Sequence, residues 1–261
     1  MILYEHPLSP YAQKVKIALR EKNVPCEMRL PIGLGTGAGY ASDFAAASPR
    51  NEVPALIDGD TRLFDSTIIL EYLDEKWPQP ALMPSDPESR ARSRMIEEAM
   101  DTHYEAINWG LGEIEFMKRA TGALATELIS NAKRQAESWW SWLTRELGSA
   151  DWFSGRTFGR ADLSVIPYLN GSAGFGLAPD RDSALGAWVA RANARPAVAA
   201  TADEATASRN GLYALPDLIA KGLFKREYRD YRLEWMIKTG GLSVVLEGLD
   251  KKNIRFSPDF A

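Results

Sequence analysis

The stretch that decides the fold is VPALIDGDTRLFDSTIILEYL, residues 53–73. It holds two short apolar segments, Val53–Ile57 and Thr61–Phe64, on either side of Asp58-Gly59-Asp60. This composition is typical of two strands joined by a tight hairpin turn. The second segment leads into Ser66–Lys76, where apolar residues recur at helical spacing. The stretch therefore predicts a β-hairpin followed by a helix.

The residues before this hairpin predict a strand, a helix and a second strand. Ile2–Glu5 and Cys26–Leu30 have the composition of short strands. Between them, Pro10 to about Lys22 has an apolar helical face, and a serine before a proline suits the start of a helix. Gly33–Gly39 contains four glycines and predicts an irregular loop. A crossover in one half and a hairpin in the other predict a small mixed sheet of four strands.

Beyond the hairpin the composition changes to that of helices alone. Trp77–Pro87 contains four prolines and is typical of a linker. From Glu88 to Ala207 the periodicity of apolar residues predicts helices and no strands. We expect these helices near 88–119, 124–147, 160–170, 183–193 and 197–207.

Composition excludes several classes of function. The chain has 261 residues, 45% of them hydrophobic and 25% charged, as in an ordinary globular protein. A formal net charge of −4 gives no basic field for nucleic acid. The one cysteine, Cys26, excludes an intrachain disulfide, and two histidines make a multi-histidine metal site improbable. We find no secretory signal and no apolar stretch that could span a membrane, so we expect a cytoplasmic protein without metal.

Four motifs occur in the order and spacing of one known family. They are Ser9–Leu19, Ser48–Leu56, Asp65–Leu73 and Phe158–Leu163. In turn they resemble the first loop and helix of the serine-type glutathione transferases and that family's NPxGxVPAL, ESxAIxxYL and FSxAD segments. By this resemblance the chain is identified as a glutathione transferase of the serine type, bacterial and theta/zeta-like, with a C-terminal helical extension.

The resemblance implies an α+β protein: an N-terminal thioredoxin-like domain with a mixed four-stranded sheet, followed by a C-terminal all-α domain. We place the glutathione-binding domain at 1–77 and the linker at 78–88. The all-α domain follows at 89–261 and includes an extension from about residue 210. Members of the family are usually homodimers, and we expect the same here.

The resemblance also implies an enzyme of detoxification that stabilises the glutathione thiolate for attack on a hydrophobic electrophilic small molecule. Glutathione is then a substrate rather than a resident cofactor. Transfer by addition or displacement, isomerisation, dehalogenation, ether cleavage and peroxide reduction all remain open. Because fold alone does not fix chemistry, the alternative is a non-catalytic interaction module with the same fold.

Ser9 is the candidate for the catalytic hydroxyl, since serine-type members carry it at this position. Lowering a thiol pKa from about 8.5 to about 6.5 takes roughly 2.7 kcal/mol of preferential stabilisation of the anion. A hydroxyl donor together with a helix N-terminus can supply this. Tyr11 is the alternative donor. Ser9 as a plain helix cap, worth about 1 kcal/mol, is the structural alternative.

Five residues are candidates for binding the peptide: Glu52, Val53, Pro54, Asp65 and Ser66. The resemblance implies a cis bond before Pro54, with the Val53 backbone pairing with the cysteinyl part of glutathione. Asp65 and Ser66 meet the γ-glutamyl end at a helix N-terminus. Glu52 departs from the family's usual lysine or glutamine near the glycyl end. The structural alternatives are a trans proline that starts an edge strand and a plain helix cap at Asp65-Ser66.

The expected helix at 88–119 carries the candidates for the electrophile site. His103, Tyr104, Ile107 and Leu111 share one face of it, and the family binds the second substrate against this helix. An apolar stripe of this kind is also typical of a core.

The tail beyond about Asn210 predicts a helix at about 224–239. Its aromatic residues are spaced by three or four and so share a face, while its basic and acidic residues interleave as on a solvated helix. We hypothesise that the tail folds back on the α domain and covers the mouth of the cleft. The alternative is packing on the far side of the molecule.

Overall fold

The computed structural model describes residues 1–36 and 39–256. Four strands form one sheet in the order β2-β1-β3-β4. β1 (Ile2–Tyr4) pairs in parallel with β2 (Glu27–Arg29) and antiparallel with β3 (Ala55–Asp58), and β3 pairs antiparallel with β4 (Thr61–Phe64). The mixed four-stranded sheet is thereby confirmed. Part of the expected loop at 33–39, residues 37 and 38, lies outside the described residues.

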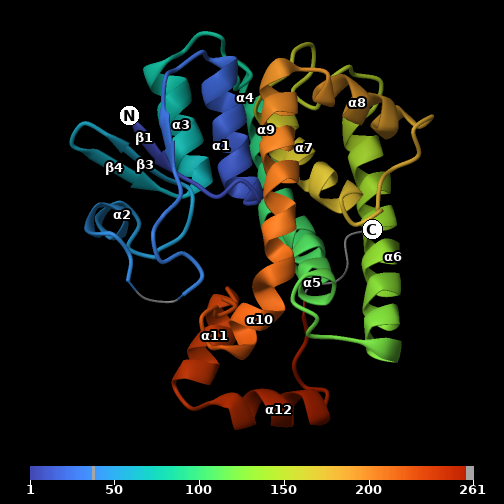
Figure 1. Ribbon diagram of the computed structural model, residues 1–261. Coiled ribbons are helices and arrows are strands. Elements are labelled where there is room, and N and C mark those ends of the chain that lie inside the picture. The colour runs from blue at the N-terminus through green and yellow to red at the C-terminus, as the bar shows by residue number, and fades with distance from the viewer. Residues whose placement is uncertain (37–38, 257–261) are drawn as a thin grey trace.

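Three helices belong to this N-terminal part. α1 (Pro10–Glu21) and α3 (Ser66–Lys76) pack side by side, and they lie between the sheet and the helical half of the molecule (Figure 1). The short α2 (Ser42–Ala47) packs on β3 and β4 and was not predicted. No side chain caps its N-terminus. It is held instead by the buried ring of Phe44, which packs against Tyr4.

The rest of the described chain is helical. Six helices form the main body: α4 (Pro87–Ala99), α5 (Glu105–Glu115), α6 (Gly122–Leu147), α7 (Arg160–Ala173), α8 (Ala184–Asn193) and α9 (Pro196–Arg209). After a 3₁₀ turn, the extension adds α10 (Leu215–Ala220), α11 (Tyr231–Lys238) and α12 (Leu242–Asp250). No helix in the described ranges combines the length and the apolar run that crossing a bilayer requires.

A π-helical turn at Met100–Tyr104 interrupts the helix that we expected at 88–119. A π turn closes its hydrogen bonds one residue later than an α turn. Every residue beyond it is therefore turned about the helix axis by roughly one position, or ~100°. The turn joins α4 to α5 and changes which residues of α5 face the N-terminal domain.

The expected helix at about 224–239 is shorter than predicted. Helical structure begins only at Tyr231, where Asp230 caps α11 by accepting a hydrogen bond from Leu233 N at 2.8 Å. Residues 224–230 form no regular element. The predicted aromatic stripe is thus divided: Phe224 packs against a buried cluster, whereas the side chain of Trp235 is exposed.

Candidate active site

Three of the sequence motifs meet at one end of the sheet. In the strand register Tyr4 lies opposite Ala55, and Ala55 lies opposite Phe64. The loop that carries Ser9 follows β1, the Val53-Pro54 pair precedes β3, and Asp65-Ser66 follows β4. Because Tyr4, Ala55 and Phe64 lie side by side, the three loops next to them are neighbours in space, although they are far apart in the sequence.

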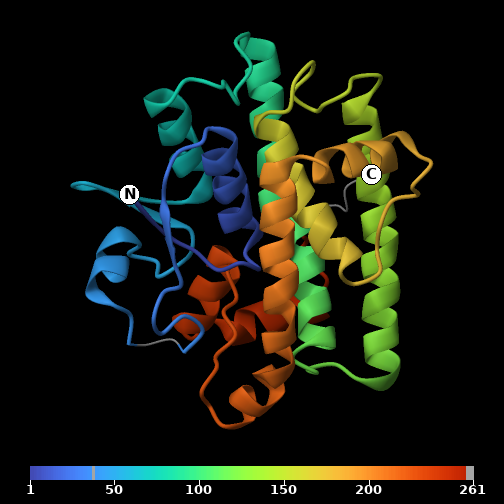
Figure 2. The same cartoon turned by 45° about the horizontal axis from the view of Figure 1, so that its top comes forward.

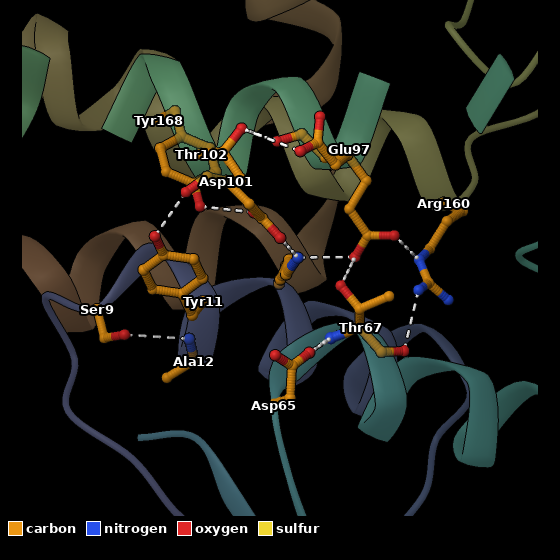
Figure 3. A network of polar contacts seen from close by, with 12 residues as sticks. Ser9, Tyr11, Ala12, Asp65, Thr67, Glu97, Asp101, Thr102, Arg160 and Tyr168 are labelled. Atoms are coloured by element: carbon orange, nitrogen blue, oxygen red, sulfur yellow. Dashed lines mark hydrogen bonds and ion pairs between the residues drawn. The ribbon is translucent and has the colours of Figure 1, made fainter. Parts of the chain in front are cut away.

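Ser9 caps α1. Its backbone is extended and its Oγ accepts a hydrogen bond from Ala12 N at 3.3 Å (Figure 3). Because the hydroxyl is the acceptor in this bond, its own hydrogen is available for a second partner. Ser9 can therefore cap α1 and donate a hydrogen bond to a ligand sulfur at the same time.

Tyr11 directs its hydroxyl to the helical domain. The hydroxyl donates to the carbonyl oxygen of Asp101 at 2.7 Å, and the ring meets Tyr168 edge-on with centroids 6.2 Å apart. Burial, with the nearby charges of Glu105 and Asp101, raises the pKa of Tyr11. Its single proton is thus already donated to a backbone carbonyl.

The peptide-binding candidates around β3 have the backbone geometry that we expected. The bond between Val53 and Pro54 is cis. The carboxylate of the preceding Glu52 forms ion pairs with Arg50 Nε at 3.2 Å and with Arg229 Nε at 3.3 Å. Burial raises the pKa of Glu52, while the two arginines act in the opposite direction.

Asp65 and Ser66 begin α3. Asp65 has a positive φ of 75°, and its carboxylate accepts a hydrogen bond from Thr67 N at 3.0 Å (Figure 3). The other carboxylate oxygen lies 3.4 Å from Nη2 of Arg50. Ser66 is buried at the first position of the helix. The capping role of Asp65 is thereby observed, and the same helix end presents N–H groups suited to a carboxylate.

A buried polar network connects this helix end to the helical domain (Figure 3). Thr67 Oγ1 donates to Glu97 Oε1 at 3.1 Å, and Arg160 Nε donates to Glu97 Oε2 at 2.6 Å. Lys14 Nζ lies 2.7 Å from Glu97 Oε1 and also pairs with Asp101. Burial favours protonated Glu97, but Lys14 and Arg160 outweigh it and lower the pKa of this carboxyl. Two cations and two carboxylates thus balance within the domain interface.

The structure corrects the expected electrophile site. Tyr104 is fully buried, with its hydroxyl 2.9 Å from Ser172 Oγ, and burial raises its pKa to about 12. Ile107 and Leu111 lie in the hydrophobic core. His103 is exposed, and its ring lies beside Trp139 of α6 with centroids 6.4 Å apart. The predicted face is therefore divided: Tyr104, Ile107 and Leu111 face the helical bundle, whereas His103 lies on its surface.

A different face of this helix points to the N-terminal domain and the extension. Asp101, Glu105, Trp109 and Glu113 are spaced by four residues and share it. The carboxylate of Asp101 pairs with Lys14 of α1, and Trp109 lies under the guanidinium of Arg226 at 4.4 Å. Sequence reasoning missed these residues. The pattern that could have identified this face is a series of three acidic residues and one tryptophan at every fourth position.

Residues 224–231, which we call the bridging segment, contact both domains. Lys225 N donates to Gly35 O at 2.8 Å in the N-terminal domain. Tyr228 packs on Trp109 of α5, with ring centroids 4.6 Å apart. Figure 1 shows the extension, α10 to α12, below the N-terminal part and α5, and in Figure 2 its red helices appear between the blue and green parts. The extension therefore contacts the N-terminal domain as well as the α domain.

No group of three or more histidine, cysteine, aspartate or glutamate side chains within the described ranges is arranged to hold a metal ion. The site instead combines a hydroxyl at a helix N-terminus, a backbone edge before β3 and a second helix N-terminus. This arrangement suits a small peptide with carboxylates and a thiol.

Comparison with known proteins supports the same interpretation. The model of the glutathione S-transferase N-terminal domain matches residues 3–81. Glutathione S-transferase Z1 of Arabidopsis thaliana is 44% identical over 89 residues, which are 34% of this chain and 40% of that protein. A stringent starvation protein A homologue of Haemophilus ducreyi is 35% identical over 173 residues, 65% of this chain and 73% of the relative.

A solved structure shows the likeness in three dimensions. Maleylacetoacetate isomerase of Methylobacterium extorquens AM1, with bound malonate and glutathione, has a TM-score of 0.62 and 26% identity. The alignment covers 77% of this chain and 95% of that one. The thioredoxin-like domain followed by a helical domain, the motifs gathered at the sheet end and these relatives agree: the chain belongs to the glutathione S-transferase family.

Proposed function

We propose that the protein is a glutathione transferase in which Ser9 stabilises the thiolate for attack on an electrophilic small molecule. The observation that carries this proposal is the strand register that gathers the Ser9 loop, Val53-Pro54 and Asp65-Ser66 at one sheet end. Each of these three segments suits a different part of one peptide. The bound glutathione of the Methylobacterium isomerase supports the same choice of ligand.

Each of the three segments binds a different part of glutathione. The N-terminus of α3 receives the γ-glutamyl carboxylate through its N–H groups, and the Asp65 carboxylate holds the ammonium. The backbone of Val53 pairs with the cysteinyl residue as an added strand. This places the thiol near the start of α1.

Ser9 then acts on the sulfur. The thiol loses its proton to solvent, and the Ser9 hydroxyl donates a hydrogen bond to the resulting thiolate beside the N-terminus of α1. The thiolate forms a bond to the electrophilic carbon. It either displaces a leaving group, which departs with the bonding electron pair, or adds to a double bond, whose other carbon then takes a proton from solvent. From the family we further propose a cytoplasmic homodimer, with domains at 1–77 and 89–261 joined by the linker at 78–88.

Replacing Ser9 by alanine is expected to lower kcat/KM with glutathione at least about tenfold, or ~1.4 kcal/mol. The reason is loss of the hydrogen bond to the thiolate, so the pKa of bound glutathione should rise as well. Steady-state kinetics with a generic electrophile and ultraviolet titration of the bound thiolate measure the two effects.

Ser9→Thr is the matched control, because it retains both the hydroxyl and the ability to cap α1. It should keep most of the activity, and circular dichroism should show Ser9→Ala folded. Unchanged turnover in a folded Ser9→Ala variant would contradict the role of Ser9 and direct attention to Tyr11 or to backbone N–H groups.

A non-catalytic interaction module is the second candidate, because one relative, which matches 65% of this chain, is named a stringent starvation protein A homologue rather than a transferase. Retention on immobilised glutathione together with turnover of a generic electrophile supports the enzyme. A chain that fails both assays while folded would favour the module.

A further inference from the structure

The bridging segment brings two arginines to the space between the domains. Arg226 Nε lies 2.7 Å from Glu113 Oε1 of α5, and Arg229 Nε lies 3.3 Å from Glu52 Oε1 next to Val53. These two contacts attach the segment to the helical domain and to the N-terminal domain, respectively. Both arginines are close enough to Glu105 of α5 for their charges to lower the pKa that burial raises.

Without this segment, carboxylates would outnumber cations around Val53, because Glu52 and Asp65 would share Arg50. Glu52 precedes Val53, Asp65 caps α3, and the carboxyl of Glu105 on α5 interacts with the charges of Arg226 and Arg229. Glutathione carries two carboxylates and one ammonium, so its net charge is negative. Uncompensated carboxylates in a partly buried site repel an anion strongly, because the local dielectric is lower than that of water. A site for this peptide therefore needs additional cations near Glu52.

Arg226 and Arg229 differ in how far they are already engaged. The Arg226 guanidinium is stacked 4.4 Å from the ring centre of Trp109 and paired with Glu113, so it anchors the segment on α5. The Arg229 side chain is 40% exposed, and its contacts with Glu52 and Glu227 use Nε and Nη2. A guanidinium has five N–H donors, so these two contacts leave donors for a ligand.

We infer that Arg229 binds the glycyl carboxylate of glutathione, with Glu52 holding the guanidinium in place. The γ-glutamyl end lies at α3 and the cysteinyl backbone lies on Val53, so the remaining carboxylate points away from α3, to the side where Arg229 meets Glu52. Arg229 thus supplies, from the far end of the chain, the positive charge that Glu52 cannot provide. The inference rests on the proposed function, because it assigns a residue to the same peptide.

Calorimetric binding to the full-length protein tests this inference with two probes, glutathione and glutathione amidated at its glycyl carboxylate. The wild-type protein should bind glutathione about tenfold more tightly than the amide, because a charge-assisted hydrogen bond is lost in the amide. Arg229→Gln should weaken glutathione binding by about the same factor and leave the affinity for the amide nearly unchanged.

Arg232→Gln is the matched control, since Arg232 is exposed on α11 and its loss changes the net charge equally. It should leave both affinities unchanged. Equal weakening of both probes by Arg229→Gln would overturn the inference by showing a general structural effect, and tighter binding would show that the segment blocks the site. A wild-type protein that binds neither probe would overturn the proposed function itself.

Discussion

Replacing Lys14 by methionine is expected to lower the free energy of unfolding by about 3–5 kcal/mol, the usual loss when one partner of a buried ion pair is removed. Lys14 is 0% exposed, and its Nζ contacts both Glu97 and Asp101. Without it, the cation that remains beside the two carboxylates is Arg160, which already pairs with Glu97 and with Glu71. Chemical denaturation followed by circular dichroism measures the loss.

Lys76→Met is the control for this experiment. Lys76 also contacts a carboxylate, that of Asp58, but its side chain is 42% exposed, so water replaces the lost contact and the effect should be much smaller. Adding Asp101→Asn to Lys14→Met should recover part of the stability, because it removes one unpaired charge. A Lys14→Met protein as stable as the Lys76→Met control would show that the network does not hold the domains together.

Replacing Asp162 by alanine is expected to cost a similar amount, about 3–5 kcal/mol, because it leaves several buried donors without an acceptor. The Asp162 carboxylate is fully buried near the start of α7. It accepts hydrogen bonds from the backbone N–H groups of Phe153, Ser154 and Gly159 at 2.8–3.1 Å and from Trp188 Nε1 at 2.9 Å. The carboxylate thus ties α7 to the preceding loop and to α8.

Two variants test whether the hydrogen bonds, rather than the volume of the side chain, account for this loss. Asp162→Asn keeps the shape but has one acceptor oxygen, so its stability should lie between those of the wild type and Asp162→Ala. Trp188→Phe removes one of the four donors to Asp162 together with part of the ring, so it should lower the free energy of unfolding less than Asp162→Ala does. If chemical denaturation places Asp162→Asn level with the wild type, the charge and the second oxygen have no part in holding the loop.

The sheet and the first helices could be predicted because their signals are local. Asp58-Gly59-Asp60 marks a turn between two apolar segments, and Ser9-Pro10 marks a helix start, so β3, β4 and α1 lie within one or two residues of their expected positions. These features need no knowledge of distant parts of the chain. The candidate peptide-binding residues lie in these same local motifs, so they could be named from the sequence.

The elements that depend on distant contacts could not be predicted in this way. The π turn at Met100–Tyr104 contains no proline or glycine, and Asp101 within it contacts Lys14 and Tyr168. Basic and acidic residues interleave at 224–230 as they do on a solvent-exposed helix. Their partners, Glu52 and Glu113, lie more than a hundred residues away, and periodicity carries no information about them. For these reasons Tyr104, Ile107 and Leu111 of the predicted electrophile face lie in the core, and the helix predicted at about 224–239 begins only at Tyr231.

The buried lysines of α1 have a consequence for cooperativity. Lys14 and Lys16 are almost fully buried, and their carboxylate partners include Glu97 on α4 and Glu204 on α9, both encoded after the proline-rich linker. A fragment that ended at the linker would fold around two ammonium groups without these counter-charges. Glu5 would still pair with Lys16 in such a fragment, but Lys14 would lose both of its partners. We therefore expect the linker to act as a crossover within one cooperative unit, and the N-terminal fragment to be less stable than the same domain in the whole chain.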